Sequence, residues 1–234
     1  FPVKSLQGEV SILCFLDDEY VLYNPGNDQW RQGNMDYGDY LVNKSFTNEE
    51  VRIDQNGVVH IALIHFGNSI RYYENSSGHF AEHIVDGFDW GLGPMDFELD
   101  ENGFAHIAYH HREEGLKYAS NKTGDWVIEN PDGPFDSVDY EMDLVFDSNS
   151  NPWILYLDGT AGLSLAYETN SRWQKETIHT PAAEDVICKL ALDSQDRPHA
   201  LYVPDSGTKT LFYAVKQNGA WVLSSLDYGV RYPN

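Results

Sequence analysis

Residues 100–109 read Asp-Glu-Asn-Gly-Phe-Ala-His-Ile-Ala-Tyr, and this pattern occurs four times along the chain. Its turn begins with an aspartate in each copy, at Asp54, Asp100, Asp147 and Asp193, with spacings of 46, 47 and 46 residues. The sixth residue after each aspartate opens a short apolar run, at His60, His106, Trp153 and His199. A period of this length indicates a repeat protein in which each copy is one supersecondary unit.

Two aromatic positions complete each copy. A tyrosine follows the apolar run, at Tyr72, Tyr118, Tyr167 and Tyr213, and a second aromatic residue comes 6 to 8 residues later, at Phe80, Trp126, Trp173 and Trp221. A weaker fifth copy lies at the N-terminus, where Ser11-Ile-Leu-Cys is followed by Tyr23 and Trp30. We therefore expect one domain over residues 1–234 with five copies, at approximately 1–39, 40–90, 91–136, 137–185 and 186–234.

Each copy predicts four short strands, as the third copy illustrates. Met95–Asp100 alternates apolar and acidic residues, which is typical of a half-buried strand. The Asn and Gly that follow suit the positive φ of a hairpin turn. The other expected strands of this copy are Ala105–His110, Leu116–Ser120 and Asp125–Glu129. The predicted fold is all-β, a five-bladed β-propeller of four-stranded antiparallel blades.

Two other arrangements of the same copies stay open. Each copy is also compatible with one rung of an open solenoid, although rungs are usually shorter and less aromatic. The chain is also compatible with part of a six- or seven-bladed ring. In a five-bladed ring, closure would depend on packing of the first copy against the last, with the tail Asp227–Asn234 as a latch.

The repeat resembles the Asp-box and sialidase-like β-propeller superfamily. The resemblance lies in the Asp-x-Asn-Gly turns, in His106-Ile-Ala-Tyr, and in Leu116-Lys-Tyr-Ala followed by Trp126. It implies the propeller fold and no particular activity. The complete Asp-box motif is absent, and the seven arginines do not stand in a recognisable sialidase motif.

The charge of the chain narrows its partners. The sequence has 15 Lys and Arg against 37 Asp and Glu, a formal net charge of −22. This argues against nucleic acid and against an anionic membrane surface, because both need clustered cations. The longest apolar run, Val10–Leu16, is far shorter than a membrane span. Neutral or cationic partners are favoured.

The cysteines and sequons bear on localisation. Cys14 and Cys188 do not form a disulfide framework or a metal motif, and whether they pair is left open. Three glycosylation sequons begin at Asn43, Asn75 and Asn121, and they slightly favour an extracellular, secreted protein.

Features that recur in every copy are expected to be architectural. We expect the histidines after the turns to be packed residues that donate to backbone carbonyls. A ligand site is expected where the copies differ, on the face formed by the loops that join second to third strands and successive blades. These loops place aromatic rings beside carboxylates, which suits neutral sugars. The candidate ligand-binding residues are Tyr37, His65, Phe88, Asp89, Trp90, His110, His111, Asp139 and Tyr140.

No complete catalytic constellation is present, but two partial ones are. The segment from Ala105 to Ser120 resembles the His-His strand and loop of propeller polysaccharide lyases, which implies His110 or His111 as base with Tyr109 beside it. Asp96 and Asp143 share a position with Glu50 and Lys189 at the inner strands, where paired carboxylates would suit glycosidase chemistry. No cofactor is clearly indicated, and calcium in an Asp/Asn turn stays open.

The sequence therefore predicts a lectin-like propeller that binds a glycan or another small polar ligand on an acidic, aromatic loop face. The alternative is a carbohydrate-active enzyme, either a polysaccharide lyase or a glycoside hydrolase. A protein-interaction scaffold is a further alternative, because fold resemblance alone does not distinguish these classes.

Overall fold

The structure of the protein is a computed structural model. It describes residues 2–4, 10–16, 19–24, 29–34, 46–65, 68–87, 92–133, 142–158, 162–179, 187–203 and 210–227. All regular secondary structure in these ranges is β-strand.

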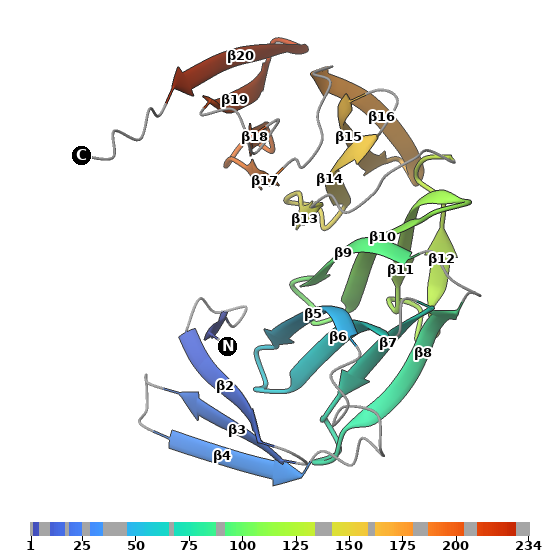
Figure 1. Cartoon of the computed structure of the whole chain (residues 1–234), viewed down its shortest axis with the longest axis vertical. Helices are drawn as coiled ribbons and strands as arrows, with labels where there is room; N and C mark the ends of the chain where they lie inside the picture. Colours follow the sequence, from blue (N-terminus) through green and yellow to red (C-terminus); the bar gives the residue numbers. More distant parts are fainter. Residues whose placement is uncertain are drawn as a thin grey trace, which may run out of the picture. The chain divides into compact units, whose positions relative to one another are not determined.

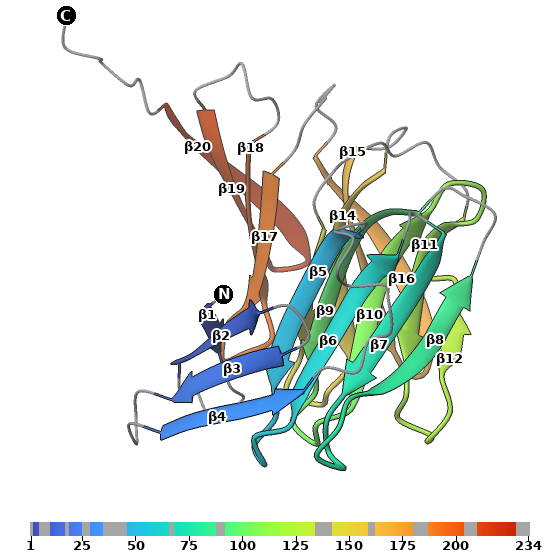
Figure 2. The same ribbon diagram turned by 60° about the horizontal axis from the view of Figure 1, so that its bottom comes forward.

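The strands form five four-stranded sheets, each in chain order (Figures 1 and 2). The first sheet contains β1 (Pro2–Lys4), β2 (Val10–Leu16), β3 (Glu19–Asn24) and β4 (Gln29–Asn34). The second contains β5 (Phe46–Ile53), β6 (Val59–His65), β7 (Ser69–Glu74) and β8 (Ala81–Gly87). The third contains β9 (Leu92–Leu99), β10 (Ala105–His111), β11 (Gly115–Ser120) and β12 (Val127–Glu129). The fourth contains β13 (Asp143–Phe146), β14 (Pro152–Asp158), β15 (Gly162–Thr169) and β16 (Arg172–His179). The fifth contains β17 (Ile187–Leu192), β18 (Pro198–Val203), β19 (Thr210–Gln217) and β20 (Ala220–Asp227).

This organisation confirms the predicted all-β fold with four-stranded sheets. Neighbouring strands are antiparallel throughout the first, second, fourth and fifth sheets. In the third sheet, β9 begins earlier than expected and β12 is shorter. Strand β10 ends one residue later than expected, so the expected position of His111 in the following loop is wrong.

The chain divides into two compact units. The first comprises Phe1–Leu92, Phe97–His106 and Ser120–Val127, and the second comprises Gly93–Asp96, Ile107–Ala119 and Ile128–Asn234. In the first unit, all seven residues of β6 are buried. In the second unit, one apolar cluster joins the fourth and fifth sheets through residues such as Leu155 and Tyr202, and another includes Leu116 and Leu144.

The recurring aspartate closes the turn between the first and second strands of each of the last four sheets. Oδ1 of Asp54 accepts the N–H groups of Asn56 and Val58, each at 2.8 Å. The same pair of bonds recurs at the three later aspartates. The fourth turn residue has positive φ in each case, at Gly57, Gly103, Ser150 and Asp196. Only two copies have glycine at this positive-φ position. In the other two, the hydrogen bonds of the aspartate hold the same backbone conformation.

The histidine after each turn bonds to side chains of its own sheet. Nδ1 of His60 lies 2.6 Å from the hydroxyl of Tyr72, and His199 has the same contact with Tyr213. Nε2 of His199 lies 3.3 Å from Oδ2 of Asp193. The expected bond to a backbone carbonyl is therefore wrong at His60 and His199, because the tyrosine hydroxyl and the turn carboxylate lie within reach of the ring. In the fourth sheet Trp153 takes the position and stacks on Tyr167, with centroids 4.4 Å apart.

The recurring tyrosine and tryptophan join neighbouring sheets. In the first unit, Tyr72 of β7 meets Trp126 edge to face, with ring centroids 5.1 Å apart. In the second unit, Tyr118 of β11 meets Trp173 of β16 in the same way at 5.1 Å. Edge-to-face contacts of this kind add to the apolar burial of the rings. The expectation that recurring features are architectural is thus confirmed at both contacts.

Buried histidines make the stability of the protein sensitive to acid. Burial lowers the pKa of both His60 and His106, although Asp54 and Asp100 act in the opposite direction. The unfolded chain therefore binds protons first, and stability is lost as the pH falls below about 6.5. We expect the free energy of unfolding, measured with urea, to fall between about pH 7.5 and pH 5.5. This fall should be smaller in His106→Gln than in the unaltered protein.

His79→Gln is the matched control, because His79 is exposed in a turn. It should keep the full pH dependence. An unchanged pH dependence in His106→Gln would contradict the role given to this histidine.

Candidate functional site

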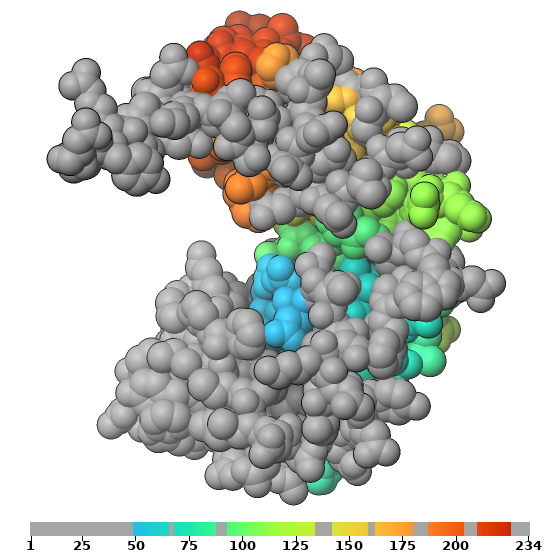
Figure 3. Space-filling view, viewed as in Figure 1, coloured from blue at the N-terminus to red at the C-terminus, as the bar shows by residue number. Residues whose placement is uncertain are grey.

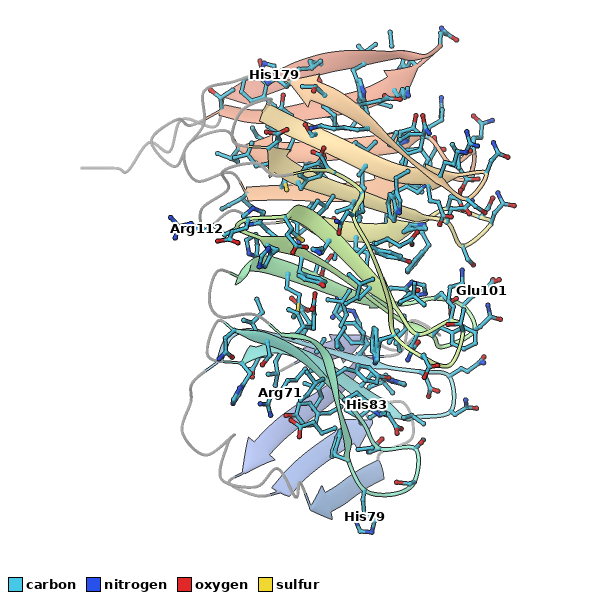
Figure 4. The ribbon with its side chains drawn as sticks, turned by 90° about the vertical axis from the view of Figure 1, so that its right-hand side faces the viewer. Arg71, His79, His83, Glu101, Arg112 and His179 are labelled. Carbon is cyan, nitrogen blue, oxygen red and sulfur yellow. The ribbon has the colours of Figure 1, made fainter. Side chains whose placement is uncertain are left out.

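The candidate site lies where the second strand of each sheet ends, and we call this side the loop end of a sheet. His65, His111, Asp158 and Val203 are the last residues of β6, β10, β14 and β18. In the second unit, Arg112 and His179 lie at this end (Figure 4). In the first unit, Arg71 and Glu101 lie toward opposite ends of the strands, and Glu101 belongs to an aspartate turn (Figure 4). The loop end and the aspartate turns are therefore separate surfaces.

The structure describes three of the nine predicted ligand-binding residues. These are His65, His110 and His111, and all three are buried. The other six lie outside the described residues: Tyr37, Phe88, Asp89, Trp90, Asp139 and Tyr140. Burial, followed by the neighbouring Arg71, lowers the pKa of His65, so this histidine is neutral at pH 7.

His110 and His111 are packed at the end of β10. A Cβ atom added to Gly93 would lie 2.8 Å from Nδ1 of His110, so the glycine makes room for this ring. Nδ1 of His111 accepts the N–H of Glu114 at 3.1 Å. Tyr109 is fully buried and stands at the repeat position of Tyr156 and Tyr202, which are buried to the same degree. Each of these candidate catalytic side chains is therefore buried and packed in the sheet.

Asp96 and Asp143 link inner strands of adjacent sheets. Oδ2 of Asp96 accepts the N–H of Leu144 at 2.6 Å, and Oδ2 of Asp143 accepts the N–H of Leu190 at 2.5 Å. Oδ1 of Asp143 also accepts a bond from Lys189 at 2.9 Å. These carboxylates satisfy backbone groups of the next sheet, so their recurrence has an architectural cause.

The same repeat position is also bonded in the first unit. Glu50 accepts a bond from Arg52 at 2.9 Å, and the second guanidinium nitrogen of Arg52 donates to Glu98 at 2.8 Å. The guanidinium thus joins a strand of the second sheet to one of the third. Burial works against the charged form, yet the bonds to Glu98 and Glu50 raise the pKa of Arg52.

A charged junction lies between the third and fourth sheets, formed by Asp132, Tyr156, Asp158 and Lys175. The Tyr156 hydroxyl donates to Oδ2 of Asp132 at 2.7 Å. Lys175 Nζ donates to Asp132 and to Asp158, each at 2.6 Å. Burial works against its charge, but the two carboxylates raise the pKa of Lys175, which stays protonated.

An aromatic junction stands at the equivalent place between the fourth and fifth sheets, formed by His179, Tyr202 and Phe212. The Tyr202 hydroxyl lies 2.6 Å from Nδ1 of His179. Phe212 stacks on Tyr202 with centroids 5.3 Å apart and meets the His179 ring at 5.5 Å. Tyr202 is buried, whereas His179 and Phe212 are partly exposed.

Sequence reasoning missed both junctions. Tyr156 and Tyr202 each stand three residues after the start of their apolar run, and this recurrence was the available signal. Their partners give no comparable signal, because Asp132 and His179 differ in type and precede the tyrosines by 24 and 23 residues.

Two other cations near the loop end, Arg71 and Lys117, are paired with carboxylates. Arg71 donates to Glu82 at 2.5 Å, and Tyr73 donates to the same oxygen at 2.7 Å. Lys117 forms an ion pair with Glu114. Side chains in such ion pairs can still form hydrogen bonds, but each pair carries no net positive charge. Such surfaces suit uncharged polar ligands better than polyanions.

The described residues contain no group of three or more His, Cys, Asp or Glu side chains suited to hold a metal ion. Oδ1 of each recurring turn aspartate already accepts two backbone N–H groups. No helix among the described residues is long and apolar enough to cross a membrane.

Comparison with known proteins identifies the fold. The sequence matches no family model, and no curated protein matches it. The structure is similar to AofleA from Arthrobotrys oligospora, with a TM-score of 0.62 and 10% identity over 97% of this chain and 72% of the other. It is also similar to the fucose-recognising Aleuria aurantia lectin, a six-bladed β-propeller, with a TM-score of 0.59 and 15% identity over 96% of this chain and 76% of the other.

A third similar structure is a prolyl endopeptidase, with a TM-score of 0.57 and 9% identity. It aligns with 96% of this chain but with only 34% of the endopeptidase. At these identities the likeness concerns the fold, and together with the four-stranded sheets it confirms the predicted β-propeller.

The inner carboxylates generate a prediction about stability. Asp96→Ala should lower the free energy of unfolding by about 1–3 kcal/mol, because the N–H of Leu144 loses its charged acceptor. Urea unfolding followed by circular dichroism measures this change.

Glu101→Ala, in an exposed turn, is the control and should change stability by less than about 0.5 kcal/mol. Equal stabilities for the two variants would show that Asp96 does not link the sheets.

Proposed function

We propose that the protein is a lectin-like β-propeller that binds neutral glycans at the loop end of its sheets. The observation that carries this proposal is the fold likeness to lectins over 96–97% of the chain. Three of the similar structures are complexes with fucosides, so fucosides are the first ligands to test.

The chemistry of the loop end supports a neutral ligand. Arg71, Lys117 and Lys175 are each paired with a carboxylate, and the chain carries a net charge of −22. A sialylated or uronate-rich glycan would meet net repulsion, whereas sugar hydroxyls can bond to both members of an ion pair. The six predicted ligand residues outside the described ranges, among them Phe88 and Trp90, belong to this proposal as further contacts.

We favour binding over catalysis. His110, His111 and Tyr109 are at most 5% exposed, so substrate contact with the lyase-like segment would need a rearrangement of β10. Asp96 and Asp143 are bonded to backbone N–H groups of adjacent sheets, which does not favour a glycosidase pair.

We further propose an extracellular location, which the ligand class supports. The sequons at Asn75 and Asn121 add little weight, because both side chains have a structural role. Oδ1 of Asn75 accepts the N–H of Val59 at 2.7 Å, and Oδ1 of Asn121 accepts that of Ala105 at 2.8 Å.

A glycan array tests the proposed function. We expect binding to neutral glycans, with fucosides included, and weaker binding to their sialylated forms. Affinity should change little between about 0.05 and 0.5 M salt, because few charges are involved. The absence of binding above background, or binding only to sulfated glycans with steep salt dependence, would contradict the proposal.

We also propose that the five sheets are the blades of one five-bladed propeller. Leu201 supports this, because it stands at the repeat position of Leu155, two residues after the start of the apolar run. Leu155 is fully buried against the next sheet, whereas Leu201 is 45% exposed. Atoms of the fifth sheet, orange to red, lie at the surface in Figure 3. The Asp-box resemblance of the turns is consistent with the same arrangement.

This arrangement predicts that Leu201 behaves as a core residue, because a neighbouring sheet covers its face in a closed propeller. Leu201→Asp should lower the free energy of unfolding by about 3 kcal/mol or more. Ile84→Asp, at a position 65% exposed on β8, should cost less than about 0.5 kcal/mol. Comparable small effects at both positions would count against the closed five-bladed form.

A further inference from the structure

The two junctions occupy equivalent places but differ in chemistry. In each, a buried tyrosine of the second strand contacts a residue at or just after the end of the preceding sheet, Asp132 for Tyr156 and His179 for Tyr202. At the charged junction, Lys175 additionally bonds to Asp132 and Asp158. At the aromatic junction, the partner is an imidazole that lies beside two aromatic rings.

We propose that the aromatic junction holds the ligand, with His179 as donor to a sugar hydroxyl and Phe212 against the apolar face of the sugar ring. This rests on the proposed glycan-binding function and specifies where it is exerted. The charged junction, whose polar groups already bond to one another, serves as a link between sheets.

The role of His179 as a donor to the ligand depends on which ring nitrogen carries its proton. Burial raises the pKa of Tyr202, so its hydroxyl keeps its proton. Burial lowers the pKa of His179, so the imidazole is neutral at pH 7. We assign that single ring proton to Nε2, so that Tyr202 donates to Nδ1 across the 2.6 Å contact and Nε2 carries the ring N–H. Tyr202 is the positioning residue, since it fixes both the tautomer and the orientation of the ring.

The exposure of the three side chains fits this division of roles. Tyr202 is 1% exposed and stacks within 16° of parallel on Phe212, so it is held in place. His179 and Phe212 are partly exposed and present an N–H donor and an aromatic face side by side. A neutral monosaccharide offers the matching pair of surfaces, a hydroxyl and a patch of C–H groups.

The arrangement also makes ligand binding dependent on pH. Protonation of His179 places a proton on Nδ1, which then donates to the Tyr202 hydroxyl oxygen and no longer accepts from it. The hydroxyl must turn its own proton elsewhere, and the contact that orients the ring is reorganised. Among the described residues of the packed strands, Tyr202 on β18 is the titratable group against His179, and Phe212 on β19 contributes no charge. Affinity should therefore fall as the pH drops below about 6.5.

The experiment is isothermal titration of the protein with methyl α-L-fucoside and with a neutral glycan-array hit. His179→Ala and Phe212→Ala should each weaken binding by about tenfold or more, as expected when a main contact is lost. Phe212→Leu keeps an apolar residue of similar size, and it should weaken binding because the flat ring is lost. His79→Ala and Phe104→Ala replace exposed residues at the opposite end of the strands and should leave affinity unchanged.

Two further variants separate a ligand contact from a packing role. His179→Gln keeps an N–H donor that does not titrate, so its affinity should vary little between about pH 7.5 and pH 5.5 while that of the unaltered protein falls. Tyr202→Phe keeps the stacked ring but removes the hydroxyl, and it should lower affinity and change the pH profile.

The possible failures are distinguishable. If the unaltered protein binds neutral glycans and the His179 and Phe212 variants bind equally well, the aromatic junction is not the site and the proposed function stands. If the unaltered protein binds no neutral glycan, both proposals are overturned. A pH profile of His179→Gln identical to that of the unaltered protein would also overturn the role of His179.

Discussion

A four-stranded sheet of about twenty-five residues has two faces and cannot bury both by itself, so each sheet of this chain depends on a neighbour. The recurring side chains make the contacts between neighbouring sheets. Tyr72 and Tyr118 meet the tryptophan of the following copy, and Asp96 and Asp143 satisfy backbone N–H groups of the following sheet. The aspartate turns and their histidines stiffen each sheet for the same purpose. Recurrence in this chain therefore marks architecture.

Function is to be sought where equivalent positions differ. The junctions at the loop end share one buried tyrosine but contain either a salt-bridged cluster or an aromatic group. The cluster around Lys175 satisfies its own charges, whereas His179 and Phe212 leave a donor and a ring face beside each other. In our proposal a single scaffold thus holds a structural link at one junction and a sugar site at the next.

The repeat pattern predicted the sheets well, because turn chemistry and apolar alternation are local properties. Asp147 illustrates this: its turn lacks glycine, yet the aspartate alone indicated the hairpin that the structure contains. The contact between Lys175 and Asp132 had no such signal, because the residues lie 43 positions apart in segments that do not recur. His111 was expected in the loop after the second strand, but β10 continues through it, and its burial depends on contacts that the local pattern does not indicate.

The central claim is that the loop end binds a neutral sugar while the aspartate turns serve the fold. Backbone amide spectra recorded during titration with methyl α-L-fucoside test it most directly. The account predicts shifts that saturate at Ile178, His179, Tyr202 and Phe212, with the turns at Asp54, Asp100, Asp147 and Asp193 unmoved. Shifts confined to the turns, or no saturable shift anywhere, would contradict it.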